Sequence, residues 1–175
     1  MYDPVAPLLE HWHEFYLLVG TAAAALVALL FVAASIGADF MSAELRSGTR
    51  TYMSPVVLHF TAVLFACTIG LVPSHSRASI ALVIGVSALT AGAYSTLILA
   101  RIINNQSIDW ADRFFYGVAP IFAYVAALVA AGLFLRGSLH GPDVLAGAVI
   151  FLLIVNVRNA WDLMLFFSGK HRNPG

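Results

Sequence analysis

Long apolar runs separated by short polar segments dominate the pattern of this chain. Each run approaches or exceeds the roughly 20 residues that a helix needs to cross the hydrocarbon core of a bilayer. The five runs cover about residues 15–36, 55–71, 79–100, 114–135 and 145–167. Because only helices and closed barrels satisfy their backbone groups in lipid, the pattern predicts an all-α integral membrane bundle of five transmembrane helices. We expect a single transmembrane helical domain over residues 1–175.

Proline and glycine mark the breaks between the runs. Residues 37–54 are polar and predict a loop, either without regular structure or with a short interfacial helix, and Pro55 is expected in the first turn of the second helix. Gly141 and Pro142 separate the fourth and fifth runs. Pro120 lies near the start of the fourth run and predicts a kink there.

Composition and charge support a membrane protein and exclude some functions. The chain is 61% hydrophobic and 10% charged, whereas charged residues make up about a quarter of a typical soluble domain. The formal net charge is zero and the basic residues are scattered, so we expect the lipid bilayer as a partner and no nucleic acid. Cys67 is the only cysteine, which excludes an intramolecular disulfide.

The lysine and arginine residues predict an orientation. One side of the predicted membrane carries six of those that flank the runs, namely Arg46, Arg50, Arg101, Arg113, Lys170 and Arg172. The other side carries Arg77 and Arg136. The positive-inside rule then places the N-terminus outside and the C-terminus in the cytoplasm, as expected for a multi-pass protein of a bacterial inner membrane. Because no basic residue precedes the first run, we expect no cleaved secretory signal.

The fifth run carries four polar residues, Asn156, Arg158, Asn159 and Asp162. A charged side chain at the centre of a spanning helix costs about 2.5–3.5 kcal/mol on insertion scales, so such residues usually face a bundle interior or a wet cavity. Arg158 and Asp162 are one helical turn apart and can form an ion pair.

The predicted orientation places polar residues of three helices at one depth, in the cytoplasmic half of the membrane. We therefore predict an intramembrane polar cluster of His59, Tyr94, Ser95, Asn156, Arg158, Asn159 and Asp162. Asp39 and Tyr116 are further candidates, at the cytoplasmic ends of the first and fourth helices. Two roles stay open. The cluster either fixes how the helices pack, or forms a polar vestibule in which Arg158 attracts anions or Asp162 and His59 relay protons.

Catalytic and metal-binding motifs are not evident in the sequence. It has no Gly-x-Ser-x-Gly elbow, no His-Glu-x-x-His zinc helix and no cysteine pair, so we expect no enzyme and no cofactor. His11, His13 and Glu14 form a weak candidate for a metal site before the first helix. Because a metal site normally needs three or four ligands, we expect none there.

The first run resembles the opening of a known group of proteins. His13-Glu14-Phe15-Tyr16, followed by the run GTAAAALVALLFVA over 20–33, is similar to the start of uncharacterised small bacterial integral membrane proteins. Some of these carry the label "modulator of FtsH protease". The resemblance covers essentially the first helix. It implies an accessory or regulatory role beside a larger membrane protein.

Two functions follow from these features. The polar cluster, with small-residue faces such as Gly20, Ala24 and Ala28, favours a homo-oligomeric membrane protein that acts as an ion channel or in transport. The alternative is a non-catalytic accessory or regulatory subunit of a larger membrane complex, such as a membrane protease.

Overall fold

The structure is a computed structural model that describes residues 9–38, 43–73, 75–103 and 110–170, and within them the side chains of 9–35, 53–73, 75–103, 110–111 and 113–165. These ranges are almost entirely helical and contain no strand. The helices are α2 (His13–Ala38), α3 (Ala43–Leu71), α4 (Arg77–Ile103), α5 (Trp110–Arg113), η1 (Phe114–Val118), α6 (Ala119–Leu135) and α7 (Gly141–Lys170). Five helical segments are long and apolar enough to cross a membrane, which confirms the predicted all-α class and the five spanning helices. The orientation of the termini stays a prediction.

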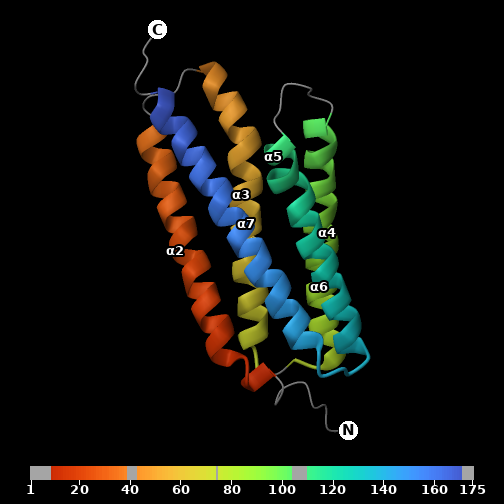
Figure 1. The fold of residues 1–175 in the computed structure, drawn as a ribbon. Helices are drawn as coiled ribbons and strands as arrows, with labels where there is room; N and C mark the ends of the chain where they lie inside the picture. The colour runs from red at the N-terminus through yellow and green to blue at the C-terminus, as the bar shows by residue number, and fades with distance from the viewer. Residues whose placement is uncertain (1–8, 39–42, 74, 104–109, 171–175) are drawn as a thin grey trace.

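Long helices that follow one another in the chain run antiparallel, and α7 contacts three of the other long helices (Figure 1). Two close pairs form, α2 with α3 and α4 with α6. Helix α7 runs obliquely across the bundle and packs against α6, α3 and α2 (Figure 1). The C-terminal part of α7 therefore lies near the ends of α2 and α3 that are distant from the α6–α7 turn.

Small residues allow the closest helix contacts. A Cβ atom added at Gly70 would lie 2.8 Å from the ring of Tyr16, which is fully buried between α2 and α3. Gly20 of α2 packs against Cys67 of α3 in the same way. A Cβ atom added at Gly20 would lie 3.1 Å from the Cβ atom of Cys67. Ala24 and Ala28, which share the small-residue face predicted for this helix, are exposed instead. Because lipid tails are as apolar as leucine, close packing of this kind stabilises a membrane bundle more than burial itself does.

The second helix begins earlier than the sequence predicts. A loop was expected over 37–54, but α3 begins at Ala43 and continues through Pro55. The loop prediction is therefore wrong for 37–38, which belong to α2, and for 43–54, which belong to α3; residues 39–42 lie outside the described part of the chain. Proline is tolerated inside membrane helices because neighbouring groups satisfy the backbone positions that it leaves open.

The turn between α6 and α7 has a standard helix-ending geometry. Gly137 has a φ of 66°, a left-handed conformation that glycine adopts without a steric penalty. Its N–H donates to the carbonyl of Phe134, and the N–H of Ser138 donates to the carbonyl of Leu133, both at 2.9 Å. This Schellman motif ends α6 and reverses the chain, so that α7 starts beside α6.

Candidate functional site: a polar ladder between three helices

The first interhelical hydrogen bond of the site lies just before Pro120. Proline has no N–H, and the helix before it widens into the π-helical turn η1, in which the N–H of Ala119 donates to the carbonyl of Phe114 five residues back. In that register the next carbonyl, Phe115 O, would require an N–H at position 120. The side-chain nitrogen Nδ2 of Asn159 in α7 donates to Phe115 O instead, at 3.0 Å.

Two more hydrogen bonds connect α7 to its neighbours at this end. The hydroxyl of Tyr116 donates to the main-chain carbonyl of Asn159 at 2.9 Å. One turn earlier in α7, Nδ2 of Asn156 donates to the carbonyl of Val56 in α3 at 2.8 Å, one residue after Pro55. Both asparagines are completely buried, at 0% and 1% exposure. Their amides therefore fix α7 against η1 on one side and against α3 on the other.

His59 and Tyr124 form the hydrogen bond that lies deepest in the bundle. Nδ1 of His59 lies 2.7 Å from the hydroxyl oxygen of Tyr124, and this bond joins α3 to α6. Both side chains are buried. Tyr124 is ten residues after Phe114, where the fourth spanning segment begins, a path of about 15 Å along a helix. That distance is about half the thickness of the hydrocarbon core, so this pair lies near the middle of the membrane.

Arg158 and Asp162 lie at the outer end of the same series. Their Nη1 and Oδ2 atoms are 2.9 Å apart, but the alignment is poor for a hydrogen bond, so the contact is mainly electrostatic. The Cζ atom of Arg158 lies 3.8 Å from the centroid of the Phe115 ring, a cation–π contact. Each of the two side chains is about one third exposed.

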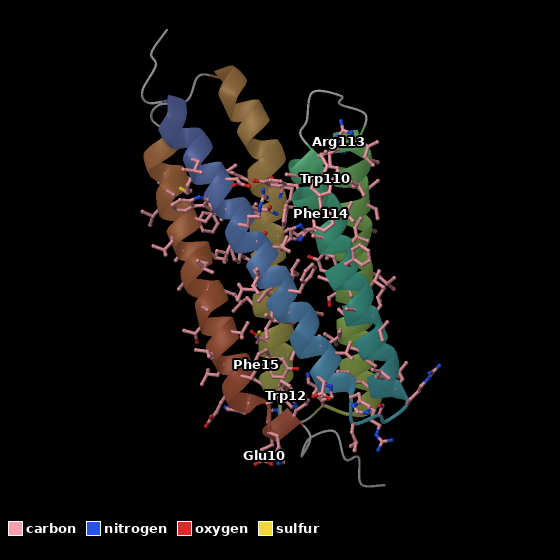
Figure 2. All side chains as sticks on the ribbon, in the orientation of Figure 1. Glu10, Trp12, Phe15, Trp110, Arg113 and Phe114 are labelled. Atoms are coloured by element: carbon pink, nitrogen blue, oxygen red, sulfur yellow. The ribbon has the colours of Figure 1, made fainter. Side chains whose placement is uncertain are left out.

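Tryptophan marks the level of this ion pair as the membrane boundary. Trp110 and Trp161 are 77% and 63% exposed, and tryptophan is enriched where lipid meets water. Figure 2 shows Trp110 and Arg113 at one end of the bundle and Glu10 and Trp12 at the other. Helix α7 has 30 residues and is therefore about 45 Å long, well beyond a hydrocarbon core of about 30 Å. Its charged residues thus lie closer to the surface than their place within the apolar run indicates.

These groups lie at successive depths along the bundle and are here called the polar ladder. Contacts join Arg158 to Asp162, Tyr116 to the main chain of Asn159, and His59 to Tyr124, while the side chain of Asn156 bonds the backbone of α3. The polar ladder runs from the membrane boundary to the middle of the bundle and consists of Arg158, Asp162, Asn159, Tyr116, Asn156, His59 and Tyr124. Five of its seven members are buried residues whose hydrogen bonds connect different helices. Such bonds are worth about 0.6 kcal/mol each on average in membrane proteins.

A small cavity begins where the ladder ends. It has a volume of about 40 Å³ and lies between α3, α4, α6 and α7. Its walls are small and larger aliphatic side chains, with two residues that carry hydroxyls, Ser87 and Tyr124. The alanines among them are Ala62, Ala66, Ala88, Ala123, Ala127 and Ala148. The volume is enough for a water molecule, and the polar groups that could hold one are at Ser87 and Tyr124. Tyr124 is therefore shared between the polar ladder and the cavity.

The other predicted cluster residues lie beside the ladder or outside the described part of the chain. The hydroxyl of Ser95 donates to the carbonyl of Ala91 in its own helix, at 2.8 Å. Tyr94 is half-buried and packs against the apolar cluster that contains Phe60. Asp39 lies outside the described residues. The structure thus brings His59, Asn156, Asn159 and Tyr116 into interhelical hydrogen bonds and leaves the polar side chains of α4 to local contacts.

The candidate metal ligands before the first helix are exposed. His11, His13 and Glu14 lie at the start of α2. Among the residues that the structure describes, no group of three or more His, Cys, Asp or Glu side chains is arranged to hold a metal ion.

Tyr124 and the two carbonyl acceptors were not among the predicted site residues. Pro120 lacks an N–H and leaves a carbonyl before it short of a donor, which Asn159 supplies. A buried proline in one span and a buried asparagine in another are therefore the signal for the contact with Phe115. The acceptor of Asn156, Val56, follows Pro55 and carries no such signal.

The fold and the ladder together define a five-span helical membrane protein with a polar interior on one side. No family model, no curated protein and no solved structure matches the chain.

Proposed function

We propose that this protein transports protons, or a polar species of similar size, through the interior of each protomer of a homo-oligomer in the bacterial inner membrane. The observation that carries the proposal is the position of Tyr124. Its hydroxyl bonds His59 at the inner end of the polar ladder, and its ring lines the cavity. Polar groups thus lead from one membrane boundary to the centre, and the cavity continues from there.

The chemistry of histidine suits the central position. A neutral imidazole has one nitrogen that accepts and one that donates, so it can take a proton on one side and release it on the other. Tyr124 can rotate its hydroxyl between accepting and donating, which lets the pair reset after each transfer. At the outer end, the side chains of Asp162 and Arg158 are each about one third exposed, so a proton could enter there from the membrane boundary.

Proton flux into liposomes tests this proposal. Purified protein is reconstituted with a pH-sensitive dye inside, and flux is started by a potassium diffusion potential. We expect wild-type flux above that of protein-free liposomes, with lower flux in Tyr124→Phe, which removes the hydroxyl. Ala127→Leu is expected to lower flux by filling the cavity. Ala93→Leu is the matched control, because Ala93 is exposed on the lipid-facing side of α4.

Two results would contradict transport along this path. The first is wild-type flux equal to that of empty liposomes between acidic and neutral pH. The second is an Ala127→Leu variant that folds and conducts like wild type. Folding of each variant is checked by circular dichroism and by the elution volume of the protein in detergent.

A second candidate function rests on the exposed flank of α7. Arg158 and Asp162 reach the surface beside Trp161, which is 63% exposed, and a charged pair near lipid favours a protein partner. An accessory or regulatory subunit would bind a larger membrane protein, such as a membrane protease, through this flank. Gentle-detergent purification from native membranes tests it. Co-purification of one partner in wild type, and its loss in Trp161→Ala, would favour this role over transport.

A further inference from the structure

Two buried oxygen atoms of the polar ladder have no hydrogen-bond donor from the described part of the protein. They are the side-chain carbonyl oxygens Oδ1 of Asn156 and Asn159. Both side chains are at least 99% buried. A buried acceptor without a donor carries a desolvation penalty, so a hydrogen-bond donor bound to either oxygen would stabilise the protein.

The orientation of both amides follows from their partners. Each Nδ2 donates to a main-chain carbonyl, Val56 O for Asn156 and Phe115 O for Asn159. A carbonyl oxygen accepts only, so the nitrogen of each amide must face it and the oxygen must face the other way. Turning either amide over would place two acceptors against each other and would not remove the need for a donor.

The unpartnered oxygens belong to a longer row on α7. Asn156, Asn159 and Asp162 follow one another at intervals of three residues, so each is displaced by about 60° round the helix axis from the one before it. Oδ2 of Asp162 also has no hydrogen-bond donor, apart from its electrostatic contact with Arg158. Acceptors within less than two turns of α7 therefore extend from the partly exposed Asp162 side chain into the bundle.

We infer that water molecules bind along this row of α7 and donate to Asn156 and Asn159. Water fits because it is small, donates two hydrogen bonds and enters from the partly exposed end at Asp162. A cation is a poorer occupant, because the guanidinium of Arg158 lies in the same row. The role of this water in proton movement rests on the proposed function, whereas the hydration itself does not.

Water-edited solid-state NMR of the wild-type protein in lipid bilayers tests the hydration directly. In this experiment polarisation passes from water to nearby amide groups, and the side-chain amide signals of the two asparagines are assigned from Asn156→Gln and Asn159→Gln. We expect both signals to grow as early as the backbone amide of Leu139, in the exposed turn between α6 and α7. The backbone amide of Ala130, which is fully buried among apolar groups, serves as the dry reference.

The outcomes separate the two proposals. Asparagine signals that grow as slowly as that of Ala130 would overturn the hydration, whatever the flux assay gives. Early growth of both signals, together with no proton flux, would support the hydration and refute transport. In the variant Asn156→Leu, early growth at Asn159 should persist, because Asn159 lies nearer to the exposed end.

Discussion

The contact between Asn159 and the backbone beside Pro120 leads to a sharp prediction about stability. In the wild type, Nδ2 of Asn159 donates to Phe115 O, which the missing N–H of Pro120 leaves without a donor in its own helix. Asn159→Leu removes this donor and leaves a buried carbonyl unsatisfied, which costs about 1–3 kcal/mol. A loss of about 2 kcal/mol corresponds to roughly a 30-fold change in the unfolding equilibrium.

The proline variant provides the test of this reasoning. Pro120→Ala restores an N–H at position 120, so Phe115 O gains an intrahelical donor and no longer depends on Asn159. In the Pro120→Ala background, Asn159→Leu should therefore cost less than about 1 kcal/mol, close to the average for one interhelical hydrogen bond in a membrane. The two substitutions should show a coupling energy of about 1 kcal/mol or more in a double-mutant cycle.

Asn156→Leu is the matched control for this cycle. Asn156 is equally buried, but its amide bonds Val56 in α3, away from Pro120. Its cost should therefore be the same with and without Pro120→Ala. Steric-trapping measurements of unfolding in bicelles, or reversible unfolding in mixed micelles, give the four free energies of each cycle. Additive effects of Asn159→Leu and Pro120→Ala would refute the view that asparagine replaces the missing proline donor.

Two further predictions concern packing and the ion pair. Gly70→Ala should destabilise the protein by about 1–3 kcal/mol, because its Cβ atom would lie 2.8 Å from the ring of Tyr16. Gly147→Ala, where no atom lies within 4 Å, should instead be neutral or stabilising by up to about 1 kcal/mol in the same unfolding assay; equal effects of the two variants would contradict the close α2–α3 contact. Arg158→Leu should cost no more than about 1 kcal/mol, since each partner of the pair with Asp162 is one third exposed and screened. Failure of that variant to fold would show that the pair is buried in the assembled protein.

Much of the polar ladder was visible in the sequence, but its connections were not. The residues His59, Asn156 and Asn159 stand out because polar side chains are costly in an apolar run. Helical periodicity places Asn156 and Asn159 on neighbouring positions of one face. Their partners are main-chain carbonyls, which every residue carries, so no side-chain pattern distinguishes Val56 as an acceptor, and Phe115 is marked only by its place before Pro120.

The depth of the charged pair shows a second limit. Arg158 and Asp162 lie inside an apolar run, and counting residues alone places them well within the membrane. The structure places Arg158 against Phe115, two residues after Arg113, at the level of the exposed Trp110. The difference arises because α7 is longer than the hydrocarbon core and crosses the bundle obliquely (Figure 1). Tilt depends on packing against other helices, which residue counts do not contain.

The amino-acid sequence by itself determined the number and type of the membrane-spanning elements. Lipid offers no hydrogen bonds to the backbone, so each sufficiently long apolar run has to satisfy its own backbone groups as a helix. Only the tertiary structure decided which helices pair, that Asn159 meets the carbonyl beside Pro120, and that Tyr124 joins His59 to the cavity. Those contacts depend on the rotation and tilt of each helix against its neighbours, and these are set by side-chain packing between segments far apart in the chain.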